Sequence, residues 1–374
     1  MKKILITYDF FYPAFKAGGP IQSLTNIAKH LGEDNKIFIL CTNKDLDGTI
    51  LNVITDKWIW VEELKVSVFY MSKKGVLFEN IIKIINNIKP SVIFINGIYS
   101  IAFSFFPALL PNSTRKIISV RGMLHPGALE IKKNKKKYYL YLYKLLRINR
   151  RCEFHATTKE EKGYIEDNFG TFKKIWVIPN LPNKFEHTTT LFKKKGYLNL
   201  VSIALIGPMK NHHLVINALK YVKAGYISYE IYGPIKDKTY WEKCKFLINE
   251  LPENISVRYK GSISPDKLSL ALDNAHFSIL PSVSENYGHS IVESLLYGKP
   301  VITSNKTPWN ELKLYKAGYN TSTLNELELV EVLNEVVSME NNEYQNWAIN
   351  AKKYIESRLN AEKTKENYLE MFYI

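Results

Sequence analysis

Cysteine is scarce in this sequence. The three cysteines, Cys41, Cys152 and Cys244, stand far apart among 374 residues, and no CxxC pair occurs. An odd, scattered set suggests neither a disulfide framework nor a zinc site. We therefore expect a protein of a reducing compartment, the cytoplasm.

Long hydrophobic runs are missing as well. No stretch reaches the roughly 18 to 20 uninterrupted apolar residues that a membrane span requires. The first residues, MKKILITYDFFYP, contain two lysines and a short apolar run without a small-residue cleavage site. This start predicts a first β-strand, and we expect a protein that is not integral to a membrane.

The two common phosphate-binding motifs are absent. Neither GxGxxG nor GxxxxGK(S/T) occurs, so the chain carries no dinucleotide fingerprint and no P-loop. Any phosphate must be held in another way. We also expect no DxD-like acidic pair in a cleft loop, and no metal site.

The residues that are present suffice for two folded domains. The chain is 46% hydrophobic and 23% charged, far from the composition of disordered proteins. Its length exceeds one typical core and fits two domains of roughly 150 to 200 residues. The net charge of +15 favours anionic partners: nucleic acid, acidic lipid or phosphate-bearing substrates.

Short aliphatic runs alternate with amphipathic stretches along the chain. In the first half, KIFILCT (36–42) and SVIFING (91–97) predict strands, and IQSLTNIAKHL (21–31) and FENIIKIINNIK (78–89) predict helices. A second series starts at LNLVSIALIG (198–207). Such alternation predicts α/β structure with two Rossmann-like, doubly wound parallel sheets facing a cleft.

The two series join near residues 177–197, where prolines, threonines and lysines interrupt the regular spacing of apolar residues. We predict an N-terminal domain over residues 1–184 and a C-terminal domain over 185–355. Residues 356–374 are expected to form a helix that crosses back to the N-terminal domain.

The charge is concentrated in residues 131–151, IKKNKKKYYLYLYKLLRINRR. This basic segment has nine lysines or arginines, four tyrosines and no acid. One interpretation is a basic helix on an anionic membrane surface, with tyrosines at headgroup level and lysines at phosphates. The alternatives are a solvated helix face and, less favoured, a nucleic-acid contact.

A glycine pair follows the first predicted strand, in AGGPIQSL (17–24). Gly18 and Gly19 permit a positive φ and a close approach of backbone N–H groups to a ligand, and Pro20 suits a first helical turn. A plain strand-to-helix turn would use the same residues, so the local sequence leaves both interpretations open.

Two glutamates flank a predicted helix start in SENYGHSIVESLLYGKP (284–300). The pattern places Glu285 in the loop after a buried strand and Glu293 about one turn inside the helix. The helix N-terminus at Gly288 to Ser290 suits a diphosphate, and Glu293 suits neutral ribose hydroxyls. The alternative is that both glutamates are ordinary surface charges.

These segments together resemble retaining family-4 glycosyltransferases of the GT-B fold. The likeness includes the E-x7-E pair, the glycine loop at residues 17–24, SVRGMLHPGAL (119–129), FHATTKEE (154–161) and VIPN (177–180). It extends through residues 230–268 and 284–312, and so covers nearly the whole chain. The Arg-Gly-Met-Leu segment resembles that of a bacterial surface-polysaccharide subgroup.

The resemblance implies a role for each matching residue. Glu285 would face the transferred sugar, and Lys210 would bind the donor diphosphate, as the catalytic pair. The donor-binding set would be Glu293, Asn286, Tyr287, Gly288, His289, Gly19 and Arg258, with Tyr259 near the base. Arg121 and His125 would bind the acceptor in the N-terminal domain.

Two positions depart from the family pattern. Leu205 stands where relatives have a second cation, an arginine, and fixed cations stabilise a leaving diphosphate by about 3 kcal/mol. Arg121 and Lys306 are the candidates to replace it. Asn96 stands where relatives often have histidine, which weakens an acceptor role at that position.

The resemblance predicts hexose transfer from a nucleotide sugar, with UDP favoured, to a lipid-diphosphate-linked oligosaccharide. The setting would be O-antigen, capsule or exopolysaccharide synthesis, in a cytoplasmic enzyme peripheral to the membrane. No cofactor, metal or nucleic acid is expected. The alternatives are a nucleotide-sugar 2-epimerase and a non-catalytic subunit that binds a membrane or partner enzyme.

Overall fold

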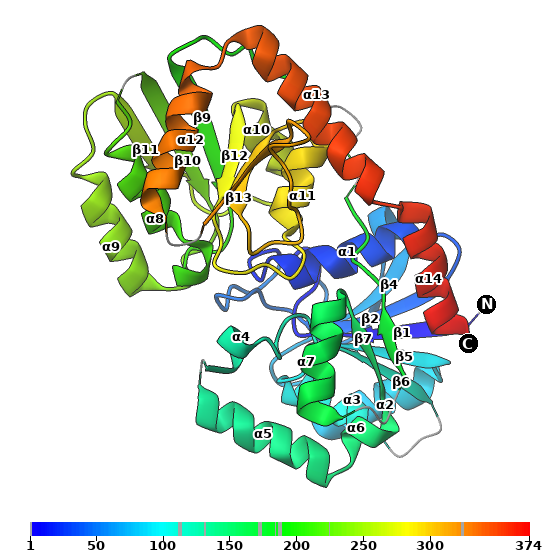
Figure 1. Cartoon of the computed structure of the whole chain (residues 1–374). Coiled ribbons are helices and arrows are strands. Elements are labelled where there is room, and N and C mark those ends of the chain that lie inside the picture. The colour runs from blue at the N-terminus through cyan, green and yellow to red at the C-terminus, as the bar shows by residue number, and fades with distance from the viewer. Residues whose placement is uncertain are drawn as a thin grey trace. The chain divides into compact units, whose positions relative to one another are not determined.

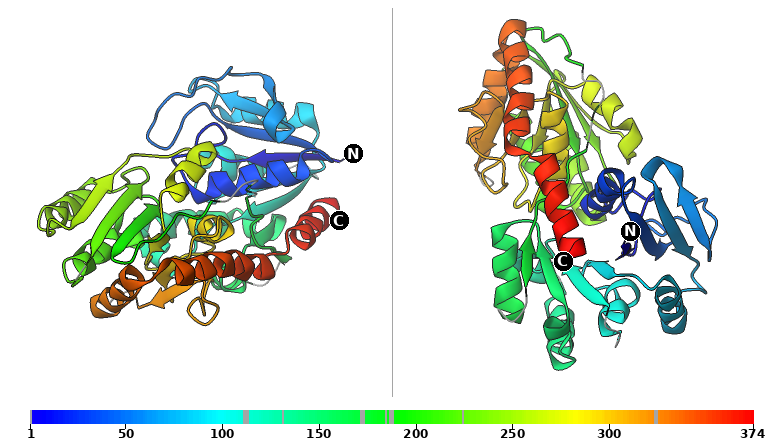
Figure 2. Two further views of the ribbon diagram at one scale, coloured as in Figure 1. Left: turned by 90° about the horizontal axis from the view of Figure 1, so that it is seen from above. Right: turned by 90° about the vertical axis from the view of Figure 1, so that its right-hand side faces the viewer.

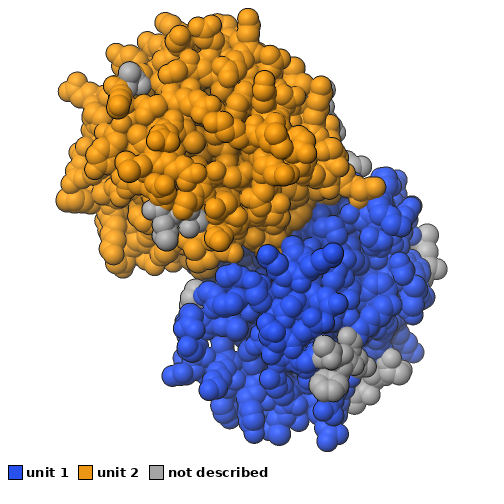
Figure 3. Space-filling view, in the orientation of Figure 1, with its two compact units in different colours: residues 1–181, 361–374 blue, residues 182–360 orange. Residues whose placement is uncertain are grey.

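The computed structural model describes residues 2–110, 114–130, 132–170, 174–183, 185, 189–223, 225–322 and 325–374. The chain divides into two compact units, coloured separately in Figure 3. Unit 1 comprises residues 1–181 and 361–374, and unit 2 comprises residues 182–360.

Unit 1 is built on an eight-stranded sheet in the order β3-β4-β2-β1-β5-β6-β7-β8 (Figure 1). All neighbouring strands are parallel except β3, which pairs antiparallel with β4. The strands are β1 (Lys3–Thr7), β2 (Lys36–Thr42), β3 (Trp58–Val61), β4 (Val66–Met71), β5 (Val92–Asn96), β6 (Arg115–Ser119), β7 (Glu153–Ala156) and β8 (Ile175–Val177).

Helices cover both faces of this sheet because successive strand residues point to opposite sides. Ile4 and Ile6 pack in one core with α1 and α14, whereas Leu5 packs in another with α2, α3, α5 and α7. Figure 2 shows α1 (blue) beside α14 (red) in both views. The helices of unit 1 are α1 (Gly19–Leu31), α2 (Phe78–Ile88), α3 (Phe106–Leu109), α4 (Pro126–Glu130), α5 (Lys133–Leu145), α6 (Ile148–Arg151), α7 (Lys159–Phe169) and α14 (Ala361–Tyr373).

The basic segment is not one continuous helix, as the sequence suggested, and its first residue, Ile131, lies outside the described residues. Helix α5 ends at Leu145, and Arg147 adopts a left-handed φ of 55° before α6 begins. This break turns Ile148 and Asn149 into the interior while Arg147 stays exposed.

Unit 2 has a six-stranded, fully parallel sheet in the order β11-β10-β9-β12-β13-β14. Its strands are β9 (Tyr197–Ile203), β10 (Tyr226–Tyr232), β11 (Ile255–Tyr259), β12 (Phe277–Leu280), β13 (Val301–Ser304) and β14 (Gly318–Thr321). Its helices are α8 (His212–Leu219), α9 (Lys238–Ile248), α10 (Leu268–Asp273), α11 (His289–Leu296), α12 (Glu326–Ser338) and α13 (Asn341–Arg358).

The two faces of the second sheet also have separate cores. Helices α8, α9 and α12 pack on one side, and α10 and α11 on the other (Figure 1). The predicted fold class, two α/β domains with largely parallel sheets, is confirmed. In both units the first strand lies inside the sheet, where the strand order reverses, and ligands of open α/β sheets bind at the carboxyl edge of such a point.

Within the ranges that the structure describes, no helix is both long enough and apolar enough to cross a bilayer.

Close backbone packing at Gly318 gives a stability prediction. Gly318 pairs with Val301 between β14 and β13, and a Cβ added there would lie 2.0 Å from the Val301 carbonyl oxygen. Gly318→Ala should lower the free energy of unfolding by about 3 kcal/mol. Gly163→Ala is the control, because Gly163 lies inside α7 with nothing within 4 Å of an added Cβ. It should stabilise by roughly 0.5 to 1 kcal/mol, and equal urea midpoints for the two variants would contradict the packing argument.

Candidate active site

Lys210 and Glu285 form an ion pair in unit 2. The Lys210 ammonium contacts Oε1 of Glu285, and the Ser282 hydroxyl donates to the same oxygen at 2.7 Å. The Lys210 side chain is 23% exposed and that of Glu285 is 11% exposed. The carboxylate is therefore held by a cation and a hydroxyl, and both side chains are partly exposed.

Strand topology brings these two residues together. Lys210 ends a 3-10 turn (Pro208–Lys210) in the loop after β9, and Glu285 lies in the loop after β12. Strands β9 and β12 are hydrogen-bonded neighbours, and β9 lies at the point where the strand order reverses. The pair thus occupies the place where open parallel sheets bind ligands.

The loop after β13 supports the loop that carries Glu285. The Glu285 N–H donates to the Lys306 carbonyl at 3.1 Å, and the Ser304 hydroxyl donates to the Ser282 carbonyl at 2.6 Å. The Trp309 indole N–H donates to the Tyr287 carbonyl at 2.6 Å. Three hydrogen bonds to main-chain groups fix the path of residues 282–287.

Helix α11 starts where the sequence predicted. Gly288 is its N-cap residue with a φ of 71°, and the rings of Tyr287 and His289 meet edge to face at 4.8 Å. Glu293, one turn into the helix, is only 8% exposed. The alternative that both glutamates are ordinary surface charges is therefore wrong, because both carboxylates are largely withdrawn from water.

The structure distinguishes the two candidates for the missing cation. Leu205 is half-buried in the loop after β9. Exposed Lys306 lies in the loop after β13, where its carbonyl accepts from the Glu285 N–H. Arg121 lies in unit 1, where it donates to Oδ1 of Asn96 at 2.8 and 3.0 Å and to Oδ1 of Asn180 at 2.7 Å. Lys306 is therefore the candidate whose backbone contacts Glu285.

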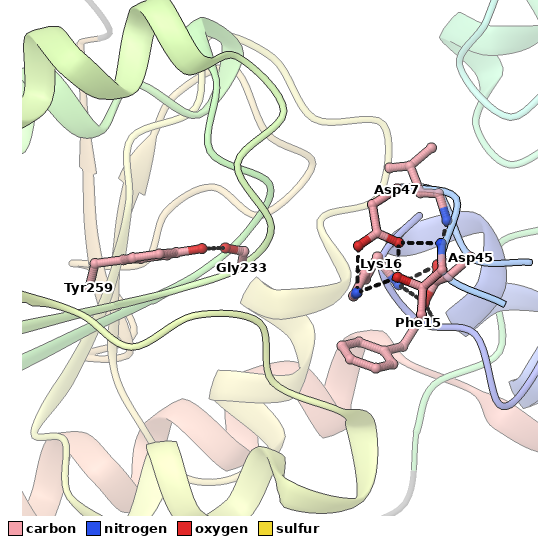
Figure 4. Close-up of polar contacts among 8 residues, drawn as sticks. Phe15, Lys16, Asp45, Asp47, Gly233 and Tyr259 are labelled. Atoms are coloured by element: carbon pink, nitrogen blue, oxygen red, sulfur yellow. Dashed lines mark hydrogen bonds and ion pairs between the residues drawn. The ribbon is translucent and has the colours of Figure 1, made fainter. Parts of the chain in front are cut away.

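Strand β11 carries the residues assigned to the base. Arg258 and Tyr259 are both exposed at the carboxyl end of this edge strand, and the Tyr259 hydroxyl donates to the Gly233 carbonyl at 2.9 Å (Figure 4). The Arg258 side chain forms no hydrogen bond or ion pair with any residue in the described ranges. The contact from Tyr259 ties the ends of β10 and β11 together, and the role of Arg258 stays a prediction.

In unit 1 the glycine loop is held by an acidic pair that the sequence analysis overlooked. Buried Asp45 accepts from the backbone N–H groups of Phe15 and Lys16 at 3.0 and 3.1 Å, and Asp47 forms an ion pair with the Lys16 ammonium (Figure 4). Asp45-Leu46-Asp47 is a DxD-like pair in the loop after β2. The expectation of no such pair in a cleft loop stays a prediction. The carboxylates of Asp45 and Asp47 serve as loop anchors, leading into α1, which begins at Gly19 with Pro20 in its first turn.

The Arg-Gly-Met-Leu segment is a tightly bound turn. Arg121 and Gly122 both have positive φ, and the Gly122 N–H donates to the carboxylate of buried Glu161. Glu161 also accepts from the N–H of Thr157 at 2.6 Å. The Asn96 amide oxygen accepts from the Arg121 guanidinium, which explains an amide at that position. The assignment of Arg121 to the acceptor stays a prediction.

His125 follows this turn. Its Nδ1 accepts from the Gly127 N–H at 3.1 Å, and its ring lies edge to face with Tyr164 at 5.4 Å. These contacts fix the ring orientation, and they leave its acceptor role untested. In the described ranges no group of three or more His, Cys, Asp or Glu side chains could hold a metal ion.

The comparisons with known proteins concern unit 2 and the whole fold. Residues 183–354 match the family described as "Glycosyl transferases group 1". No curated protein matches the chain.

Three solved structures are similar over nearly their full lengths. Sucrose-phosphate synthase from Thermosynechococcus elongatus has a TM-score of 0.71 and 13% identity, covering 100% of this chain and 98% of that one. HepE from Anabaena, in complex with UDP-glucose, has a TM-score of 0.69 and 16% identity, with 99% of each chain covered. TarM from S. aureus, a mutant in complex with fondaparinux, α-GlcNAc-glycerol and UDP, has a TM-score of 0.71 and 14% identity, with 100% of each covered.

The chain has the GT-B fold. It consists of two α/β units with largely parallel sheets, and its structural neighbours are GT-B glycosyltransferases. At these identities the similarity concerns the fold.

Sequence reasoning missed several residues that shape this GT-B site. Ser282, three positions before Glu285, carries no motif signal of its own. Glu161 was detectable, because Thr158 and Glu161 form an S/T-x-x-E pattern at the start of α7. The Thr158 hydroxyl does cap the helix by accepting from the Glu161 N–H. In a capping box this glutamate would accept from the backbone N–H of the N-cap residue. The Glu161 carboxylate instead accepts from the Gly122 N–H, in the Arg121–Gly122 turn.

His212, two residues after Lys210, gives a pH prediction. The ring is 1% exposed, and neither nitrogen has a hydrogen-bond partner among the described residues. Burial, assisted by the charge of Lys210, lowers the pKa of His212 from 6.5 to about 3. Below about pH 6.5 the unfolded chain therefore binds a proton that the folded protein rejects, so stability falls as the pH falls.

His212→Met should remove this contribution, which amounts to about 2 kcal/mol between about pH 7 and about pH 5. Denaturant unfolding of both proteins across that range is the measurement. The variant should also gain stability at neutral pH, because two unpaired polar atoms leave the core. An identical pH slope for wild type and variant would contradict the assignment of a neutral, buried imidazole.

Proposed function

We propose that this protein is a retaining hexosyltransferase that moves a sugar from a nucleotide sugar, with UDP favoured, to a glycan acceptor. The observation that carries the proposal is the Lys210–Glu285 pair, placed beside the N-terminus of α11 at the strand-order reversal of unit 2. The match of residues 183–354 to group 1 glycosyl transferases supports it, as do the UDP complexes of HepE and TarM.

Each group of the pair has a separate task in this proposal. When the donor binds, the Lys210 ammonium leaves Glu285 and pairs with the donor diphosphate. The first turn of α11 supplies backbone N–H groups and its positive dipole end to the same diphosphate. Glu285, still held by Ser282, then accepts from a hydroxyl of the transferred sugar. Glu293 accepts from the ribose hydroxyls.

Retention follows from attack on the face from which the diphosphate departs. The bond from the anomeric carbon to the diphosphate oxygen breaks, a bond to the acceptor oxygen forms, and the acceptor proton passes to the departing oxygen. Glu285 stabilises positive charge on the sugar and does not form a covalent intermediate. Lys210 compensates the negative charge that develops on the diphosphate.

Substitution of the pair tests the enzyme proposal. Glu285→Gln and Lys210→Ala should each lower kcat by about 100-fold to 1000-fold, because each removes a charge beside the reacting groups. The measurement is sugar transfer and donor hydrolysis with UDP-, GDP- and dTDP-sugars, on variants with unchanged circular dichroism. Inactivity of the wild type on the full panel would reject the proposal in favour of a non-catalytic subunit. Formation of a 2-epimer without acceptor would identify an epimerase.

Lys306 is proposed as the cation that replaces the arginine missing at Leu205. Its backbone is fixed to Glu285, and its exposed side chain makes no ion pair with the described acids. Lys306→Ala should lower kcat by roughly 100-fold. Lys313→Ala, which removes an exposed lysine paired with Glu335 in the same unit, is the control and should leave kcat unchanged. Equal rates for both variants would reject a catalytic charge at Lys306.

We further propose a lipid-diphosphate-linked acceptor and a peripheral position on the cytoplasmic face of the membrane. Tyr138, Tyr141 and Leu145 are 72%, 61% and 63% exposed and lie on one face of α5 at helical spacing. Leu140 and Tyr143, on the opposite face, are buried in the unit 1 core. An apolar stripe among lysines fits the boundary between acyl chains and phosphates of an anionic bilayer.

Removal of this stripe should weaken vesicle binding without affecting the fold. The triple variant Tyr138→Ser, Tyr141→Ser, Leu145→Ser should bind anionic vesicles roughly tenfold more weakly, because its charge is unchanged and only apolar contact is lost. Co-sedimentation with vesicles is the measurement.

The control removes three equally exposed apolar side chains from unit 2: Phe246→Ser, Leu270→Ser and Leu327→Ser. It should bind vesicles as the wild type does. A similar loss in both triple variants would mean that α5 is not the membrane contact.

A further inference from the structure

A hollow lies in unit 1 where the C-terminal ends of α5 and α7 meet α6 (Figure 1). Its volume is about 620 Å³. It is lined by residues Lys144, Leu145, Arg147, Asn149, Arg150, Glu166, Asp167, Asn168, Phe169 and Gly170. Leu145 belongs both to this hollow and to the exposed apolar stripe of α5, so the two features adjoin.

The charges of the hollow are separated into two walls. Lys144 and Arg147 stand on the α5–α6 side and form no ion pair with any acid in the described ranges. Glu166 and Asp167 stand on the α7 side, with Glu166 3.6 Å from the Lys162 ammonium. The carbonyl end of α7 adds partial negative charge to the acidic wall. A bare anion is thus attracted by one wall and repelled by the other.

Asn149 connects the two walls. Its side chain is buried, and its Nδ2 donates to the Phe169 carbonyl at 3.3 Å. This bond ties α6 to the end of α7, so the basic and acidic side chains keep their places across the hollow.

We propose that the hollow binds a phosphoethanolamine head group of a membrane lipid. The phosphate lies against Lys144 and Arg147, and the ammonium donates to the carboxylates of Glu166 and Asp167. This match of a zwitterion to two walls of opposite charge excludes inorganic phosphate as an equal ligand. The inference rests on the proposed membrane position of α5 and adds the lipid that it recognises.

The decisive comparison uses two vesicle types whose zwitterionic lipids differ at the head-group nitrogen. Both contain the same share of phosphatidylglycerol, and the remainder is either phosphatidylethanolamine or phosphatidylcholine. The two zwitterionic lipids have the same net charge and the same phosphodiester, but the choline nitrogen cannot donate. The wild type should bind the ethanolamine vesicles roughly fivefold more tightly.

The variant Glu166→Gln, Asp167→Asn separates head-group recognition from general attraction. It loses two negative charges, so it should bind all of these vesicles more tightly. Its ratio of affinities for ethanolamine and choline vesicles should fall to about one. The control, Glu130→Gln with Glu160→Gln, gains the same charge on exposed residues outside the hollow and should keep the preference. Equal preference in all three proteins would overturn the proposal.

Soluble competitors show whether the hollow recognises the whole phosphoethanolamine group or phosphate alone. Glycerophosphoethanolamine should displace the wild type from ethanolamine vesicles, and inorganic phosphate at the same ionic strength should not. Displacement by both alike would show a simple anion site and reject the proposal. Donor hydrolysis is measured in the same preparation. A protein without hydrolysis but with the ethanolamine preference contradicts the proposed transfer and leaves the head-group site standing.

Discussion

The pairing of β9 with β12 is the constraint on which the candidate site depends. Lys210 and Glu285 are 75 residues apart in the sequence, and each lies in a loop that leaves the sheet at its carboxyl edge. Because the strand order reverses at β9, no crossover helix covers the space between these two loops. A cation and a carboxylate can meet there with both side chains partly exposed. The pairing of β9 with β12 thus sets the distance between the two loops.

Carboxylates serve two purposes in this protein, and their partners tell them apart. In unit 1, Asp45 and Glu161 accept from backbone N–H groups and hold turns in place. Such carboxylates are fully occupied and cannot exchange partners without loosening a loop. Glu285 accepts only from side chains, and its own backbone is secured separately by the Lys306 carbonyl. Its loop therefore keeps its path when a side-chain partner leaves, which suits a site that has to receive a ligand.

Much of the fold was readable because buried parallel strands are continuous apolar runs. KIFILCT became β2 with the bounds that its sequence indicated, and the E-x7-E stretch formed the predicted loop and helix. Strands β3 and β4 were not anticipated, because a short antiparallel edge pair has no crossover helix to mark it. The break at Arg147 was missed because no glycine or proline announces it. The partners of Glu285 could not be predicted, since Ser282 and the loop after β13 reach it only through tertiary structure.

Exposure decides whether Lys210 can exchange its partner. A fully buried ion pair costs about 3 to 5 kcal/mol to break, whereas an exposed pair is worth at most about 1 kcal/mol. With side chains 23% and 11% exposed, Lys210 and Glu285 lie between these two limits. A diphosphate offers Lys210 more negative charge than one carboxylate does, and the Ser282 hydroxyl remains on Glu285 after the exchange. In the ligand-free protein the ion pair keeps both charges compensated and in position, and the larger charge of the diphosphate offsets the cost of separating them.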